Sequence, residues 1–321
     1  MDPTRLSSAV NAAARTLMVD QVTAEVVTAL RARGVEPILL KGPSFARWLY
    51  TADVLRPYVD TDLLVAPDQQ RTAEDVLLSL GFLDLMVKAA AAELDDHSRT
   101  FHRRRAGGGD DEVDLHFTLA GARSNPAAVW AALSGDLEHV DVAGTIVTGL
   151  GVSGRAMQVV LHAAQDGRVT DQPSTDLQRA LAVASLATWR SAAALATELD
   201  AVAAFVAGLS STPGGHEVLA SLGLSGHAGG AFERLRAASP PPMSLGIARL
   251  FERSDRRGLA LELFREVVPT PAFMRLWSPM ARRGPLGLAA AYTWRPVSLL
   301  IRLAPAVRAY LRARRTPNSH S

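Results

Sequence analysis

The sequence of 321 residues contains no cysteine and only two lysines, Lys41 and Lys88. The lack of cysteine excludes disulfides, thiolate zinc sites and a cysteine nucleophile. No apolar run approaches the roughly 20 residues that a membrane-spanning helix needs. The first ten residues lack a basic start followed by an apolar core, so they do not read as a signal peptide. We therefore expect a soluble, cytoplasmic protein.

Acidic residues are missing from the end of the chain. Residues 1–150 carry 14 basic and 21 acidic side chains, whereas residues 151–321 carry a net charge of +9. No acid follows Glu266, but nine arginines do. This arginine-rich segment predicts an anionic partner, and RNA phosphates, a membrane surface and an acidic protein remain alternatives. A solvated basic helix that packs on the domain through its apolar side is a further interpretation.

The hydrophobic pattern changes near residue 150. Before it, helical spacing over 6–33 is followed by short strand patterns at 37–40, 59–65, 98–105, 112–119 and 140–150. After it, helical patterns dominate over 153–165, 175–190, 191–208, 214–223 and 228–237. We expect an α+β fold: a small mixed β-sheet flanked by helices in residues 1–150, and a mostly helical domain in residues 151–321.

Two aspartates lie within one predicted strand. In the run Tyr58 to Val65, Asp60 and Asp62 are two residues apart, so their side chains point to the same face. Two carboxylates side by side repel each other and are costly to bury. A divalent cation such as Mg²⁺, which takes oxygen ligands, would relieve both costs. The alternative is a pair of solvated aspartates near a strand end.

A second predicted strand carries another set of polar residues on one face. Glu112, Asp114 and His116 alternate with Val113, Leu115 and Phe117. If this strand lies beside the first, Asp114 supplies a third carboxylate, and three carboxylates can hold two metal ions for in-line displacement at phosphorus. His116 would then either position an acceptor or hydrogen-bond a carboxylate, and a purely structural polar contact is the alternative.

A glycine turn lies between the strand at 37–40 and the following helix. Gly42 lets a ligand approach the backbone closely, Ser44 adds a hydroxyl group and Lys41 adds a cation. The spacing GxxxxGK[ST] of P-loop enzymes is missing.

Together these motifs resemble the nucleotidyltransferase superfamily typified by DNA polymerase β, and more closely its bacterial branch of uncharacterised nucleotidyltransferases. The resemblance covers residues 35–120 best. It is carried by Leu40-Lys41-Gly42, Leu55-Arg56-Pro57, Asp60 to Val65, Leu80-Gly81-Phe82 and Val113 to His116.

The resemblance implies a Mg²⁺-dependent enzyme with two metal ions and a nucleoside triphosphate as co-substrate. Asp60 and Asp62 would bind both ions, and Asp114 would bind the ion on the acceptor side. By the same resemblance, a second set of residues would contact the triphosphate: Lys41, Gly42, Ser44 and Arg56.

The implied reaction moves a nucleoside monophosphate to a hydroxyl group of a small molecule, natural product or peptide. A toxin-like enzyme that modifies tRNA or protein, and an inactive nucleotide-binding scaffold, are the alternatives.

Overall fold

The computed structural model describes residues 3–51, 53–84, 97–105, 108–166, 171–226 and 278–315, with six single positions (235, 244, 268, 271, 274 and 275) between the last two ranges. The helices predicted over 86–96 and 228–237 lie outside the described residues, apart from position 235. In the described part of the chain, no helix combines the length and the apolar character needed to cross a bilayer.

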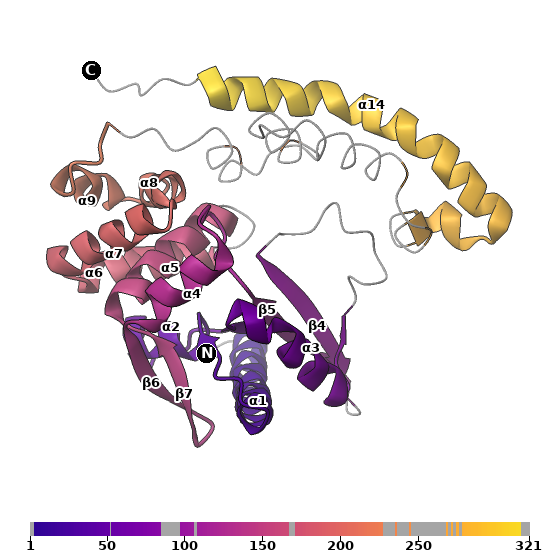
Figure 1. The fold of residues 1–321 in the computed structure, drawn as a ribbon. Coiled ribbons are helices and arrows are strands. Elements are labelled where there is room, and N and C mark those ends of the chain that lie inside the picture. The colour runs from indigo at the N-terminus through magenta and orange to yellow at the C-terminus, as the bar shows by residue number, and fades with distance from the viewer. Residues whose placement is uncertain are drawn as a thin grey trace.

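A seven-stranded mixed sheet forms the centre of the N-terminal half (Figure 1). The strands are β1 (Ile38–Leu39), β2 (Thr61–Leu64), β3 (Leu83–Asp84), β4 (Ser98–Arg104), β5 (Asp110–His116), β6 (Leu137–Val142) and β7 (Thr145–Leu150). Their order is β3-β4-β5-β2-β1-β7-β6. The central pairs β2–β5 and β1–β7 are parallel, and the other neighbours are antiparallel. This arrangement confirms the predicted α+β class.

Helices surround the sheet and make up the described part of the C-terminal half (Figure 1). They are α1 (Pro3–Ala32), α2 (Pro43–Leu49), η1 (Pro67–Gln69), α3 (Gln70–Ser79), α4 (Pro126–Ser134), α5 (Val152–Asp166), α6 (Gln172–Val183), α7 (Leu186–Glu198), α8 (Val202–Ser210), α9 (Gly215–Ser221), η3 (Pro279–Arg282) and α14 (Pro285–Arg315). Proline begins several of them because its missing N–H group costs nothing at a first helical position.

The predicted hairpins form where glycine permits a left-handed turn. Ala143 and Gly144 both have positive φ, at 49° and 82°, which suits the two-residue turn between β6 and β7. Gly108 and Gly109 take the same region between β4 and β5, at 88° and 85°.

The helix boundaries after residue 170 differ from the prediction. Two helices were expected over 175–190 and 191–208, but three are present, α6, α7 and α8. The first break falls where Ser185 caps α7 and its hydroxyl accepts a hydrogen bond from the Thr188 N–H at 3.1 Å. The second falls at Asp200, whose φ of 50° ends the helical path. Both breaks depend on single residues that a hydrophobic pattern does not weigh.

Each face of the sheet packs against its own set of helices. Leu63 and Leu115 join Val26, Leu30 and other apolar residues of α1 and α3 in one buried cluster. Leu64 joins apolar residues of α2, α4, α5, α7 and α8 in the other. Because side chains alternate along a strand, Asp62 points to the same side as Leu64, which is the α5 side.

The core on the α5 side contains residues from both sides of position 150. Ile38 and Leu64 come from the sheet, whereas Leu161 and Phe205 come from the following helices. The division of the chain into domains at residue 150 stays a prediction.

Candidate active site

The structure places the three predicted aspartates together. Strands β2 and β5 run side by side in parallel, and Asp62 lies opposite Asp114 in their register. Ligand atoms of Asp60, Glu112 and Asp114 lie within 4.8 Å of one another, and so do those of Asp62, Asp114 and His116. Asp114 belongs to both groups, so two adjacent ligand sets share one carboxylate.

Asp62 is the best compensated carboxylate of this acidic cluster. It is almost fully buried, and its Oδ1 atom lies 2.8 Å from Lys41 Nζ and 3.0 Å from His116 Nε2. Burial would raise the pKa of Asp62, but the Lys41 ammonium and the His116 hydrogen bond hold it well below its usual range. Burial also works against the charge of Lys41, yet Asp62 and Asp60 raise the pKa of this ammonium above its ordinary value. The two residues therefore form a charged pair.

The other carboxylates of the cluster are less well compensated by the described residues, although Glu112 Oε2 lies 3.6 Å from His102 Nδ1. The charge on Asp62, followed by burial, raises the pKa of Asp60 to about 7. Burial and then Asp62 raise the pKa of Asp114, although its Oδ1 accepts a hydrogen bond from Thr100 Oγ1 at 2.6 Å. Burial and the charge of Asp114 raise the pKa of Glu112. Within the described residues, these raised pKa values indicate that the negative charge of the cluster is only partly compensated.

This donor set fits a divalent cation. Carboxylate oxygens from Asp60, Glu112 and Asp114 are the hard ligands that Mg²⁺ and Mn²⁺ prefer. A cation at this position would lower the raised pKa values by supplying the missing positive charge.

The turn between β1 and α2 brings Lys41 to the cluster and leaves Ser44 away from solvent. Gly42 has a φ of 59°, a backbone conformation that other residues rarely adopt. Ser44 is only 1% exposed, and its Oγ has no hydrogen-bond partner within the described residues. Contact of Lys41, Gly42 and Ser44 with a triphosphate stays a prediction.

Arg56 is engaged with the helical layer. Its guanidinium donates from Nε to Asp176 Oδ1 at 3.0 Å and from Nη2 to Asp176 Oδ2 at 2.6 Å, and both side chains are buried. Tyr50 and Gln172 also donate hydrogen bonds to Asp176. The pair therefore ties the segment before β2 to α6, and contact of Arg56 with phosphate stays a prediction.

Two further histidines lie close to His116 or to the charges around it. The ring of His97 is 5.4 Å from the ring of His116, centroid to centroid. Burial, and next the charge of Lys41, lower the pKa of His162 on α5 well below its usual value, so this imidazole is neutral. The sequence pattern does not show that this histidine lies near the charges of Lys41 and Asp62, because it does not show which elements face α5.

Sequence reasoning also missed Thr100 and Asp176. The register of the β4–β5 hairpin places Thr100 opposite Asp114, so pairing the two predicted strands across the glycine turn was a usable signal. No local signal links Asp176 to Arg56, which lies 120 residues earlier in the chain.

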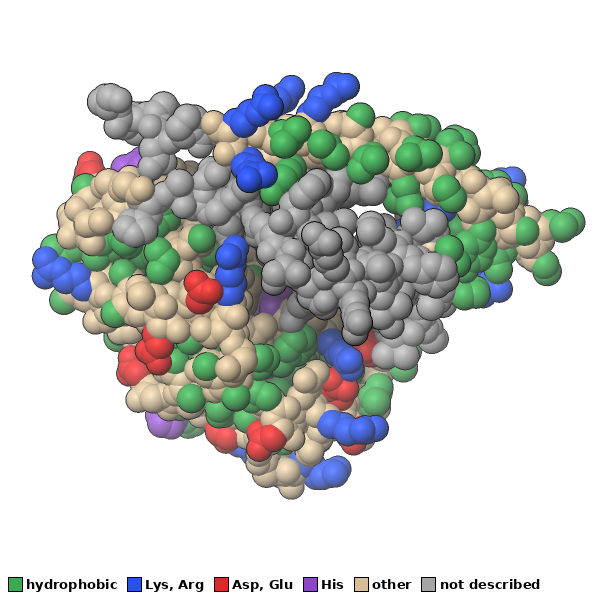
Figure 2. All heavy atoms as spheres, turned by 45° about the horizontal axis from the view of Figure 1, so that its top comes forward, with side chains coloured by type: hydrophobic (Ala, Val, Ile, Leu, Met, Phe, Trp, Pro, Cys, Tyr) green, Lys and Arg blue, Asp and Glu red, His purple; other side chains and the backbone are tan. Residues whose placement is uncertain are grey.

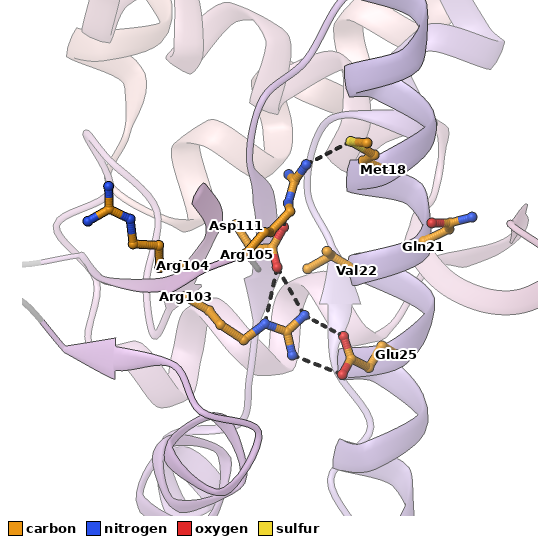
Figure 3. Close-up of a pocket in the computed structure, with 8 residues that line it drawn as sticks. All are labelled: Met18, Gln21, Val22, Glu25, Arg103, Arg104, Arg105 and Asp111. Atoms are coloured by element: carbon orange, nitrogen blue, oxygen red, sulfur yellow. Dashed lines mark hydrogen bonds and ion pairs between the residues drawn. The ribbon is translucent and has the colours of Figure 1, made fainter. Parts of the chain in front are cut away.

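A separate groove of about 460 Å³ lies between α1 and the β4–β5 hairpin (Figure 3). Arg103 pairs with Glu25 of α1 and with Asp111, and Arg105 also pairs with Asp111. Arg104 points away from these residues in Figure 3. The ion pairs hold α1 against the hairpin, and the groove lies apart from the acidic cluster because Asp111 faces the opposite side of β5 from Asp114.

Comparison with known proteins assigns the family. A family model described as uncharacterised nucleotidyltransferase matches residues 5–212, which include the whole acidic cluster. The chain therefore belongs to the uncharacterised nucleotidyltransferase family, and the predicted resemblance is confirmed. Its class is that of a nucleotide-transferring enzyme.

Two solved structures are similar at low identity. The antibiotic-resistance factor ANT(2'')-Ia shares 13% identity with a TM-score of 0.40, over 59% of this chain and 96% of that chain. An antigenic nucleotidyltransferase-like protein from Paracoccidioides brasiliensis shares 13% identity with a TM-score of 0.34, over 57% of this chain and 92% of that chain. Both values are too low to support an argument about this chain. No curated protein matches the sequence.

Proposed function

We propose that this protein transfers a nucleoside monophosphate from a nucleoside triphosphate to a hydroxyl group of a small molecule, natural product or peptide. The observation that carries the proposal is the parallel pairing of β2 with β5, which sets Asp62 opposite Asp114 and brings Asp60, Asp62 and Asp114 into two adjacent ligand groups that share Asp114. Family membership supplies the class of reaction.

Asp60, Asp62 and Asp114 would hold two Mg²⁺ ions, and Glu112 is a further oxygen ligand within reach of Asp60 and Asp114. When bound, the ions neutralise phosphate charge and polarise the reacting oxygens. Asp114 is the carboxylate common to both ligand groups, so it would contribute an oxygen ligand, and we keep it as the ligand on the acceptor side.

Asp114 also has the properties of a proton acceptor. Burial and the charge of Asp62 raise its pKa, which favours proton uptake by this carboxylate, and Thr100 holds one of its oxygens in a fixed orientation. In the proposed step, the acceptor hydroxyl gives its proton to Asp114 and its oxygen bonds to the α-phosphorus. The bond from that phosphorus to the bridging oxygen breaks, and pyrophosphate leaves.

Two further side chains would neutralise charge or fix the position of other groups. Lys41 is one candidate for neutralising phosphate charge, because it already lies at the acidic cluster. His116 would fix the orientation of Asp62 through its Nε2 atom, and acceptor positioning by His116 stays part of the proposal.

The test is transfer of label from each α-labelled nucleoside triphosphate into fractions of a cell lysate, with the full chain and Mg²⁺. We expect one class of component to become labelled, and Asp60→Asn to abolish the labelling. Asp110→Asn is the matched control, because Asp110 lies on β5 with its side chain exposed. Labelled small molecules or peptides would support the proposal.

Other results of that experiment would replace it. Label in tRNA or in a large protein would indicate the toxin-like alternative. Nucleotide binding without pyrophosphate release in any fraction would indicate an inactive scaffold. Labelling that is unchanged in Asp60→Asn would remove Asp60 from the mechanism.

A further inference from the structure

Helix α14 exposes a broad apolar surface. Among the described residues, its large apolar side chains with at least 40% exposure are Leu286, Trp294, Val297, Leu300, Ile301 and Leu303. Single exposed apolar residues are normal, but a contiguous set on one helix marks an interaction surface. Figure 2 shows hydrophobic side chains along this helix, with Lys or Arg side chains near its C-terminal end.

The apolar and basic parts lie on one side of α14. Steps of three, four and seven residues lead from Trp294 to Val297 and Ile301, and onward to Arg308 and Arg312. These steps keep residues on the same helical face. The opposite face is buried, at Ala291, Ser298, Ala306 and Tyr310 among others. One exposed stripe is therefore apolar over its first half and cationic over its second.

The charge of this stripe is of one sign. Arg308, Arg312 and Arg315 are exposed on its cationic half, and the sequence contains no Asp or Glu after Glu266. A partner that complements this surface must combine apolar volume with negative charge.

Three kinds of partner meet these demands to different degrees. RNA would satisfy the arginines but leave the apolar half in water, and the aromatic residues for base stacking are few. A second copy of α14 would cover the apolar half but bring the same arginines and no acid. An anionic bilayer offers both hydrocarbon and phosphate at the depth where amphipathic helices lie.

We propose that α14 docks this protein on an anionic lipid surface. Trp294, Val297 and Ile301 enter the boundary between headgroups and acyl chains, where tryptophan is favoured. Arg308 and Arg315 contact the lipid phosphates from the same stripe, their stems lying along the apolar boundary. The proposal concerns α14 alone and stands independently of the nucleotide-transfer reaction.

Vesicle flotation of the full chain tests the proposal. We expect the protein to bind vesicles of phosphatidylcholine with about one third phosphatidylglycerol, and to bind pure phosphatidylcholine far more weakly. Replacing Arg308, Arg312 and Arg315 by Gln should weaken binding roughly 100-fold, since each basic residue near an anionic surface contributes about one factor of five.

A second variant tests the apolar half, and a third serves as control. Val297→Ser with Ile301→Ser should weaken binding roughly tenfold. Val183→Ser with Arg190→Gln removes an exposed apolar and an exposed basic side chain from α6 and α7, and should leave binding unchanged. Circular dichroism confirms that each variant is folded.

Several results would overturn the proposal. Equal affinity for both vesicle types, or unchanged binding of the arginine variant, would contradict an anionic lipid surface. Tighter binding of single-stranded RNA than of vesicles would indicate RNA as the partner. A dimer that Ile301→Ser abolishes, in a protein that does not bind vesicles, would indicate a second copy of the chain. If the arginine variant fails to fold, a salt titration of vesicle binding by the unmodified chain tests the electrostatic contact instead. Binding that does not weaken at least about tenfold between low and high salt contradicts an electrostatic contact.

Discussion

The sheet and helix α14 differ in the sign and in the burial of their charged side chains. In the sheet, acidic side chains lie partly or fully buried, and Lys41, His116 and Thr100 contact them from neighbouring elements. On α14, charges of one sign lie exposed, and the sequence around them supplies no acid. A buried charge must be compensated by nearby groups or by a tightly bound ion, whereas solvent and dissolved ions also screen an exposed charge. The comparison distinguishes the proposed site of chemistry from the proposed surface for association.

We expect the largest effect from removing one charge of the acidic cluster. Asp62→Asn should lower pyrophosphate release roughly a thousandfold or more, because it removes a charge from the proposed metal and phosphate site. The measurement is pyrophosphate release at saturating Mg²⁺, with Asp110→Asn as control. Activity that falls equally in both variants would point to a general loss of structure.

The buried ion pair between Arg56 and Asp176 gives the next largest effect. Arg56→Met should lower the free energy of unfolding by about 3–5 kcal/mol, because it leaves Asp176 buried without its partner. Urea unfolding measures this, and the double variant Arg56→Met with Asp176→Leu should recover most of the loss. An unchanged unfolding free energy with a raised KM for nucleotide would instead assign Arg56 to phosphate binding.

The variant Lys41→Met tests whether the Lys41 ammonium compensates the buried charge of Asp62. Without metal, the variant should have a lower midpoint of thermal unfolding. Its free energy of unfolding should fall by about 2–4 kcal/mol, because Asp62 keeps a buried charge without its partner. Added Mn²⁺ should then raise the midpoint more than in the parent chain, and Lys41→Arg should behave like the parent. An equal metal-induced shift in all three proteins would show that Lys41 does not act as the counter-charge.

The pH dependence of stability tests the crowding of carboxylates. The pKa of Asp60 is about 7 in the folded chain and 3.8 as its ordinary value, so the folded form retains a proton that the unfolded form loses between these values. Its contribution to stability is therefore present below about pH 4 and is lost as pH rises to 7. Asp60→Asn should stabilise the metal-free protein by about 1 kcal/mol or more at pH 8, and little at pH 4.

Urea unfolding in a chelator at both values of pH measures the difference. A variant that is equally stabilised or destabilised at pH 4 and pH 8 would show that Asp60 does not carry the raised pKa.

The smallest expected effect lies on α14. Replacing Arg308, Arg312 and Arg315 by Gln should change the unfolding free energy by about 0.5 kcal/mol or less, and turnover with a soluble acceptor by about twofold or less. A large loss of stability or of turnover would mean that these arginines contribute to folding or to the reaction. The two regions would then not differ in the way proposed.

Much of the fold was open to prediction because its signals are local. The alternation in Glu112 to His116 located β5 and its polar face, and glycines marked both hairpin turns. The helical breaks at Ser185 and Asp200 were missed, because a cap and one left-handed residue interrupt an otherwise continuous apolar pattern.

The sequence by itself determined which side chains share a face, since the two-residue period of a strand depends only on backbone geometry. It thereby grouped Asp60 with Asp62, and Asp114 with His116. Only the tertiary structure decided that β2 and β5 are neighbours, that Lys41 faces Asp62, and that Arg56 meets Asp176. Such contacts join residues far apart in the chain, and the packing of the whole sheet and its helices selects them.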